Sequence, residues 1–165
     1  MENISGFGTK VTIVAIQSFP QGFSLSKFAD DKDPVAIDDI EPIGYQMLYD
    51  GGLFAFDKAV PVTVSVSVIP NTDDDINLKI LLQTKKGGFR YLPIEDLVSM
   101  IISYPNGGTA ILTNGTIISG PPADSITQAG RRQSNTYKFA FATFAGAQSG
   151  QQIAAGIAQN ILSIL

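Results

Sequence analysis

The sequence predicts a mainly β protein: a β-sandwich or small barrel with one flanking helix, plus a C-terminal amphipathic helix. Several short segments alternate apolar and polar residues with the two-residue period of a strand, and turn residues separate them. Helical patterns occur only at about 73–86 and at 151–165. A chain of 165 residues can bury a proper core. We therefore expect one β domain over residues 1–150 and a separate helix over 151–165.

The composition excludes most catalytic chemistry, because the chain has no histidine, no cysteine and no tryptophan. Histidine is the usual general base and metal ligand near neutral pH, and cysteine is the most nucleophilic side chain. We therefore expect no catalytic, cofactor or metal site, no small-molecule substrate and no enzyme activity. The net charge of -4 argues against a sequence-independent nucleic-acid binder, which needs a basic surface. No apolar run reaches the roughly 20 residues of a membrane span.

The first third of the chain predicts two hairpins separated by an acidic segment. Residues 10–17 and 23–28 read as strands joined at a turn over Phe19–Gly22. Residues from about 29 to 43 are acidic and contain Pro34 and Pro42, which predicts a long loop. Residues 44–48 and 53–56 flank Asp50-Gly51-Gly52, a strong hairpin signal because glycine accepts positive φ.

The clearest strand covers residues 61–69, where four valines alternate with threonine and serine. Asn71 or Thr72 can cap the helix that follows. Three aspartates fill its first turn and two lysines its last, which complements the helix dipole. The aspartates lack the alternating spacing of a calcium loop, so capping is the favoured interpretation.

The second half predicts further strands and the terminal helix. Residues 89–92 and 97–104 favour strands. Residues 110–112 and 115–119 are predicted as a hairpin around Asn114-Gly115. Residues 137–144 predict an aromatic strand with Tyr137, Phe139 and Phe141 on one face. In residues 151–165 the isoleucines follow helical spacing, and no residue is charged.

Charge is unevenly distributed, and this predicts an interface between subunits. Eight of the fifteen acidic residues lie from Asp30 to Asp57, whereas the 41 residues after Asp124 hold three basic residues and no acid. Opposite charges of this kind can meet across copies of a chain. A solvated acidic loop is the alternative. The terminal helix packs on its own domain or docks on a neighbour. The predicted interface residues are Asp30, Asp31, Asp33, Asp38, Asp39, Arg131, Arg132, Ile157 and Ile161.

The order of motifs resembles the tail-tube proteins of contractile-tailed bacteriophages and their relatives in baseplates and injection machines. The resemblance covers residues 11–83, and it is carried by Phe28-Ala29-Asp30-Asp31, Asp33-Pro34, Asp50-Gly51 and Ile69-Pro70-Asn71-Thr72-Asp73. It implies a tube-like β domain, six copies in a ring, a β-lined channel through which DNA passes without specific binding, and stacking of adjacent tube or baseplate rings through an extended loop.

By the same resemblance, residues 30–41 look like the stacking loop, and uncharged or acidic strand faces look like the channel lining. The protein would belong to the virion and assemble in the cytoplasm of a bacterial host. A repeating tube subunit and a single-ring baseplate or tube-end component are both consistent with it.

Two other functions remain open at this point. A carbohydrate- or cell-surface-binding β-sandwich of a tail fibre or baseplate predicts exposed aromatic side chains in loops. A carboxylate-based hydrolase predicts that Asp38, Asp39, Glu95 and Asp96 converge in one cleft.

Overall fold

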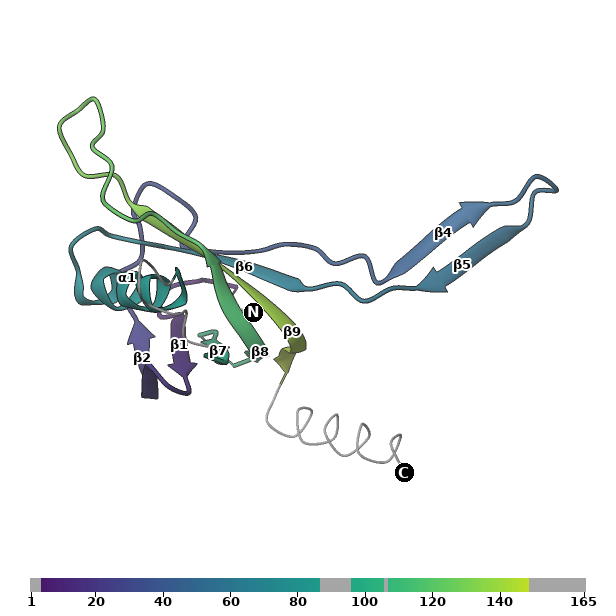
Figure 1. The fold of residues 1–165 in the computed structure, drawn as a ribbon, viewed down its shortest axis with the longest axis horizontal. Coiled ribbons are helices and arrows are strands. Elements are labelled where there is room, and N and C mark those ends of the chain that lie inside the picture. Colours follow the sequence, from purple (N-terminus) through teal and green to yellow (C-terminus); the bar gives the residue numbers. More distant parts are fainter. Residues whose placement is uncertain (1–3, 87–95, 106, 149–165) are drawn as a thin grey trace.

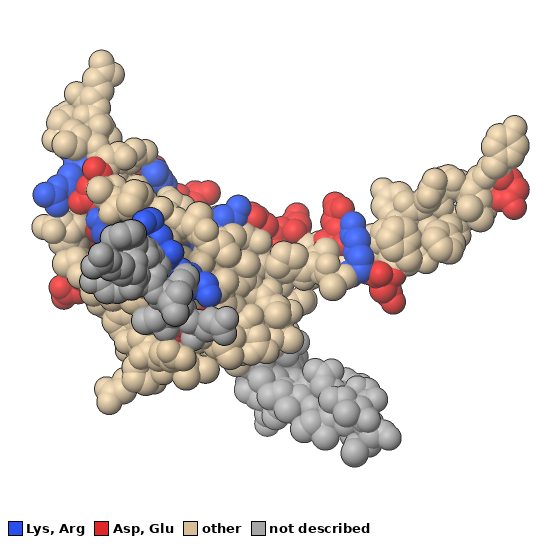
Figure 2. Space-filling model, in the orientation of Figure 1, with Lys and Arg blue, Asp and Glu red and all other residues tan. Residues whose placement is uncertain are grey.

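A seven-stranded antiparallel sheet, curled into a half-barrel, forms the body of the protein, and one helix flanks it (Figure 1). The computed structural model describes residues 4–86, 96–105 and 107–148. A separate two-stranded hairpin projects from this body as a long arm (Figures 1 and 2). The mainly β fold with one flanking helix is thus confirmed. The predicted helix over 151–165 and the predicted strand over 89–92 lie outside the described residues.

The strands of the body lie in the order β2-β1-β7-β8-β9-β6-β3, and β4 pairs with β5 in the arm. The elements are β1 (Lys10–Ala15), β2 (Phe19–Leu25), β3 (Val35–Ile37), β4 (Ile43–Met47), β5 (Leu53–Asp57), β6 (Val62–Val68), α1 (Asp73–Lys86), β7 (Val98–Ser103), β8 (Thr109–Ser119) and β9 (Asn135–Gln148).

Among the described residues, the curled sheet closes at one end. The chain leaving β2 bridges β6 at Phe28 and Val68. The amide of Ala29 donates to the Ser67 carbonyl at 3.0 Å, and the amide of Ile69 donates to the Lys27 carbonyl at the same distance. Away from this bridge, β2 and β3 are the two edges of the sheet. The body is therefore a half-barrel with an open side.

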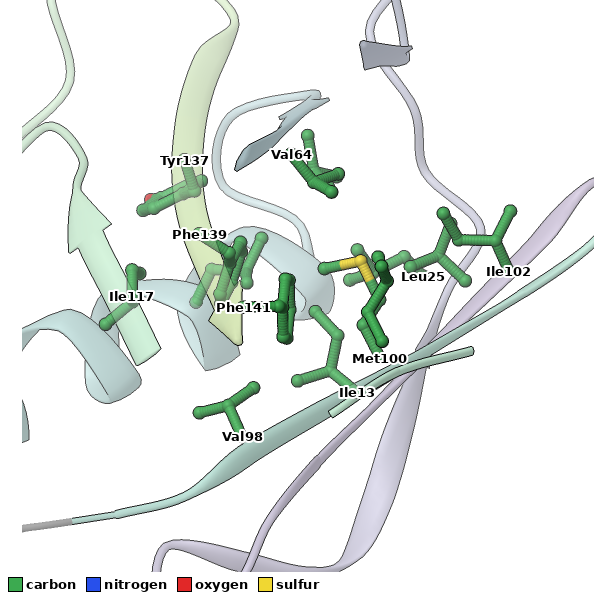
Figure 3. Close-up of a cluster of buried hydrophobic side chains, with 14 of the residues drawn as sticks. Ile13, Leu25, Val64, Val98, Met100, Ile102, Ile117, Tyr137, Phe139 and Phe141 are labelled. Carbon is green, nitrogen blue, oxygen red and sulfur yellow. The ribbon is translucent and has the colours of Figure 1, made fainter. Parts of the chain in front are cut away.

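Alternating residues of the strands fill the concave face of the sheet (Figure 3). The four valines of β6 are buried, and they lie beside Tyr137, Phe139 and Phe141 of β9. The rings of Phe139 and Phe141 stack with centroids 6.1 Å apart. Leu78 and Leu81 of α1 cover this core. The strand alternation in the sequence therefore specifies which face is buried.

Hydrogen bonds from side chains join the end of β2 to the start of α1. The Asp74 carboxylate accepts the amides of Ser26 and Lys27, each at 2.8 Å. Thr72 caps α1, because its hydroxyl accepts the amide of Asp75 at 3.4 Å, while the Asp75 carboxylate accepts the amide of Asn71 at 3.1 Å. The start of α1 is thereby fixed against the end of β2.

The first turn lies earlier than the sequence predicts. Residues 16–18 form the turn, and β2 already begins at Phe19. The predicted turn over Phe19–Gly22 is therefore wrong. The Asp96 carboxylate accepts the amides of Gln17 and Ser18 at 2.8 and 2.9 Å, so an acid 79 residues away from Gln17 stabilises the turn.

The predicted hairpin at Asn114-Gly115 is also wrong, because β8 runs through it without reversing. Asn114 adopts φ 55°, and the register against β7 shifts between Val98 and Met100. The left-handed residue is thus the extra residue of a bulge. Gly115 fits because a β-carbon there would lie 2.2 Å from Cδ1 of Phe141.

The acidic segment is not wholly a loop. Residues Val35–Ile37 form β3 and pair with β6, with Val35 opposite Val66 and Ile37 opposite Val64. The predicted loop over 29–43 therefore consists of an edge strand and two connections, and the second connection leads into the arm.

Candidate assembly surface

The most prominent surface of the molecule is the β4–β5 arm. Its strands pair in register from Ile43 opposite Asp57 to Met47 opposite Leu53. At the tip, the Asp50 carboxylate accepts the amide of Gly52 at 2.9 Å, and Gly51 adopts φ 89°. The turn chemistry that predicts the hairpin is therefore present. Both strands project well beyond the sheet (Figure 1).

Both faces of the arm carry exposed apolar side chains. By strand alternation, Tyr45 and Met47 share one face with Leu53, whereas Phe54 and Phe56 lie on the other. The Phe56 ring lies over Gly44, where a β-carbon would meet it at 2.3 Å. Eight large apolar side chains of the arm and its tip are at least 47% exposed: Ile43, Tyr45, Met47, Leu48, Tyr49, Leu53, Phe54 and Phe56. Monomeric proteins seldom expose an apolar patch of this extent.

Charges are confined to the ends of the arm (Figure 2). Asp50 lies at the tip, and Glu41, Asp57 and Lys58 lie at the base. The stretch between them is uncharged. A surface with an apolar centre and a charged rim is typical of a protein–protein interface.

Some of the acidic and basic residues predicted to form the interface form ion pairs within the same chain. The Arg131 guanidinium binds Asp30 with two hydrogen bonds of 2.7 and 3.1 Å. Hydrogen bonding from Arg131 holds the pKa of Asp30 below its usual value. Lys138 lies 3.9 Å from Asp38, and Arg132 lies 3.3 Å from Asp124.

The remaining predicted interface residues are in two groups. Asp31, Asp33 and Asp39 are exposed on the same segment as Asp30 and Asp38. Ile157 and Ile161 lie outside the described residues. The acidic segment and the basic loop thus lie side by side in one chain, and their role between copies stays a prediction.

A second charge network fastens the loop over 120–134 to the body. Lys79 contacts both Asp75, at 2.9 Å, and Asp124. The Asn135 amide donates to both carboxylates at 2.8 Å, and the Tyr137 hydroxyl donates to Asp75 at 2.8 Å. These donors satisfy the hydrogen-bonding capacity of the buried Asp75 carboxylate, so we interpret the network as stabilising the fold.

The pKa values of this network follow from its hydrogen bonds. Burial alone would raise the pKa of Asp75, but the donors Asn135, Lys79 and Tyr137 outweigh burial and lower it. Hydrogen bonds from Lys79 and Asn135 lower the pKa of Asp124. Burial and the Asp75 carboxylate together raise the pKa of the Tyr137 hydroxyl. The carboxylates of Asp75 and Asp124 are therefore ionised near neutral pH.

The carboxylates of the hydrolase hypothesis do not converge among the described residues. Asp96 binds the amides of the β1–β2 turn, and these bonds hold its pKa low against the opposing effect of burial. Asp38 and Asp39 line a different hollow, beside Ile40. Glu95 lies outside the described residues.

Residues 4–86, 96–105 and 107–148 hold no group of three carboxylate, histidine or cysteine side chains placed to bind a metal ion. Within those ranges no helix has the length and apolar character needed to cross a membrane.

The sequence predicts the arm as a hairpin but not as a projecting surface. The signal that could have found it is the run Leu53-Phe54-Ala55-Phe56, which is apolar on consecutive positions. A strand with one solvated face alternates instead. The charge pattern predicts interface residues from Asp30 to Asp39, in the segment that leads into the arm, and this stays a prediction.

A half-barrel with a long arm of exposed apolar side chains is typical of proteins that assemble with other chains. The sequence matches the family described as tail fiber protein gp32 over residues 2–145, and the chain belongs to this family. It is therefore a structural protein of the phage-type tail or baseplate. A comparison with curated protein sequences gives no match.

Two solved structures of contractile machines share the fold. One is the sheath/tube terminator of an extracellular contractile injection system (PVC) in its extended state. The TM-score is 0.52 and the identity 11%, with 88% of this chain and 96% of that chain covered. The other is a chain of the anti-feeding prophage (AFP) baseplate, with a TM-score of 0.50, 10% identity, and 88% and 95% covered.

Proposed function

We propose that this protein forms a homohexameric ring in the tube-like part of a contractile tail or its baseplate, and that the ring lines the channel through which DNA passes. The family assignment and the two similar folds support this proposal. One of those structures is described as 6-fold symmetrised and the other as a sheath/tube terminator. A ring at one end of the tube is therefore the preferred position over the repeating tube subunit.

The arm is the single observation that carries the proposal. Its exposed apolar faces need a partner, and a second copy of this chain supplies one in a closed ring. A ring also brings the edge strands β2 and β3 of adjacent copies near one another, which removes exposed sheet edges. The arm then reaches over the joint and fastens each subunit to the next.

The convex face of the sheet supplies the channel lining in this proposal. It carries hydroxyl pairs such as Thr12 with Ser24 at 3.3 Å and Thr113 with Thr143 at 2.8 Å. Lys10 and Lys138 are the only charged residues in β1, β6, β7, β8 and β9. The proposal therefore takes an uncharged channel lining rather than the acidic one that the resemblance also allows. Such a face holds phosphates weakly, so DNA can slide past it.

Light scattering after gel filtration, with negative-stain images of the same sample, tests the proposal. The expected particle has six times the 17.5 kDa mass of the chain and an open centre. The double variant Tyr45→Ser, Phe54→Ser should lose the ring. Ile76→Ser removes an exposed apolar side chain from α1 and is the matched control, which should keep it. A monomer at high concentration, or a ring that survives the arm variant, would contradict the proposal.

A second candidate is a module that binds carbohydrate on the cell surface. The exposed aromatic rings of Tyr45, Tyr49, Phe54 and Phe56 favour it, as does the family's description as a tail fiber protein. In this case host polysaccharide should bind the isolated monomer, and Tyr49→Ala should weaken binding at the tip without changing the mass of the particle. Absence of binding to any host surface glycan would dismiss this candidate.

A further inference from the structure

Two apolar hollows adjoin beside the edge strand β3, and together they form a groove. Their volumes are about 710 and 310 Å³, and they share Ile37 and Tyr104. The larger hollow extends past Ile102, and the smaller one extends past Leu112 and Phe144. Ile37 is 45% exposed and Phe144 is 55% exposed, so apolar walls of the groove are accessible from outside.

The charge in this groove lies at one end. Asp38 and Asp39 line the smaller hollow, and they are the only charged side chains among the described residues that line either hollow. The chain passes from Val35 in the larger hollow through Ile37, which both hollows share, to Asp39 in the smaller one. The groove therefore offers, in order, a larger apolar hollow, a smaller apolar hollow and an acidic end.

One face of the arm presents its groups in the complementary order. By strand alternation Phe54, Phe56 and Lys58 lie on the same face, because the amide of Lys58 still pairs with the Pro42 carbonyl at 2.9 Å. The ring centroids of Phe54 and Phe56 are 6.0 Å apart. From tip to base this face carries two aromatic rings and then a cation. The opposite face ends in Asp57, so its charge has the wrong sign for the acidic end of the groove.

The apolar area of the arm is of the size that a contact between chains needs. Its eight exposed large apolar side chains present on the order of 1,000 Å², since a single aromatic side chain can bury 150–250 Å². A stable interface takes about 800 Å² from each partner. The arm points away from its own body (Figure 1), so a groove that receives it belongs to another copy.

We propose that the groove of one copy receives the Phe54–Phe56 face of the arm of a neighbouring copy. Phe54 enters the larger hollow, Phe56 enters the smaller one, and Lys58 lies against Asp39. The contact is head-to-tail, because the arm and the groove are different surfaces of the chain, and a repeated contact of this kind can close into a ring. This inference rests on the self-assembly proposed above and names the surface that receives the arm.

Cysteine cross-linking tests the proposal, because the chain has no native cysteine. Gln46→Cys carries the thiol on the Phe54 face of the arm and leaves both phenylalanine rings in place. It is co-expressed with a tagged Ile37→Cys chain, and the particles are oxidised. We expect a disulfide between one tagged and one untagged chain. Ala55→Cys lies on the opposite face of the arm and is the matched control, which should give several-fold less of this product.

The particle mass, measured before oxidation, separates this inference from the ring proposal. A link from Gln46→Cys that exceeds the link from Ala55→Cys supports the contact, and in a particle of another size it contradicts only the six-fold ring. A six-copy ring without that link overturns the contact and leaves the ring standing. Equal linking of both probes overturns the contact too. A monomer that forms no link overturns both.

An exchange of charges tests the acidic end of the groove. Lys58→Glu and Asp39→Lys each place like charges opposite one another, so each should raise the concentration needed for assembly several-fold. The double variant restores an opposite pair and should assemble nearly as the parent does. Asp57→Lys changes the charge as much as Asp39→Lys but on the other face of the arm, and it should leave assembly unchanged. A double variant no better than the single ones would contradict the proposal.

Discussion

Gly115 packs closely against Phe141 of β9. A β-carbon there would lie 2.2 Å from Cδ1 of Phe141 and 2.6 Å from the Ala140 carbonyl oxygen. The carbonyl is backbone and cannot move aside cheaply. We expect Gly115→Ala to lower the free energy of unfolding by about 1–3 kcal/mol, measured by urea denaturation.

The control for this substitution is Gly6→Ala. No atom lies within 4 Å of a β-carbon built at Gly6. Its free energy of unfolding should therefore stay within about 0.5 kcal/mol of the parent protein. Equal effects of the two substitutions would show that the contact with Phe141 is not the cause.

The buried carboxylate of Asp75 predicts a loss of stability in acid. The pKa values of Asp75, Asp96 and Asp124 are lowered in the folded protein. The unfolded chain therefore binds protons first, and these groups stabilise the fold above their ordinary pKa. That stabilisation is lost as the pH falls from about 5 towards the lowered values. The melting temperature should be flat near neutral pH and should drop below about pH 4.

Asp75→Asn isolates one contribution to this acid sensitivity. The amide keeps the shape of the side chain but no longer titrates, so the variant should be less stable near neutral pH and lose less on acidification. Thermal melts across the pH range measure both effects. If the melting temperatures of the parent and the variant fell in parallel with pH, Asp75 would not contribute to the acid sensitivity.

At the scale of the element, the bulge in β8 depends on a left-handed residue. Asn114 adopts φ 55°, which glycine tolerates and β-branched residues do not. Asn114→Val should therefore destabilise the protein by about 1–2 kcal/mol, whereas Asn114→Gly should be nearly neutral. Chemical denaturation of the two variants checks this, and a tolerated valine would contradict the geometry.

The strands that alternate most regularly are also the ones that the sequence predicts best. Val62–Val68 is predicted because each apolar side chain faces one core, and the end chemistry of α1 predicts that helix in the same local way. The prediction of a hairpin at Asn114-Gly115 is wrong because a bulge needs the same left-handed residue as a tight turn. The predicted position of the first turn is wrong because Asp96, whose carboxylate accepts hydrogen bonds from that turn, is remote in sequence.

The candidate site is less predictable for a related reason. The turn residues of the arm predict a hairpin, but whether a hairpin joins the sheet or leaves it depends on which edge strands are already paired. Here β3 is the edge strand next to β6, and β4 and β5 pair only with each other in the described structure. Charge statistics point to the neighbouring acidic segment, which partly forms ion pairs within the chain.

At the scale of the whole molecule, the arm and the body are separable. The buried core contains no residue of the arm. Replacing residues 43–57 with a short glycine–serine linker should therefore leave the melting temperature of the body within a few degrees of the parent and abolish assembly. Circular dichroism melts and light scattering measure the two effects. Unfolding of the body would show that the arm contributes to its stability.

The root of the arm is anchored unequally on its two sides. β3 is joined to the sheet by three residue pairs with β6, whereas β6 is joined on its other side by seven pairs with β9. A mechanical pull on the arm would load both strands, and we expect β3 to separate from the sheet before β6 does, because β3 has fewer pairs. The few residues so released lengthen the stem of the arm. We therefore expect the chain to extend by a few residues under tension before the half-barrel itself is strained.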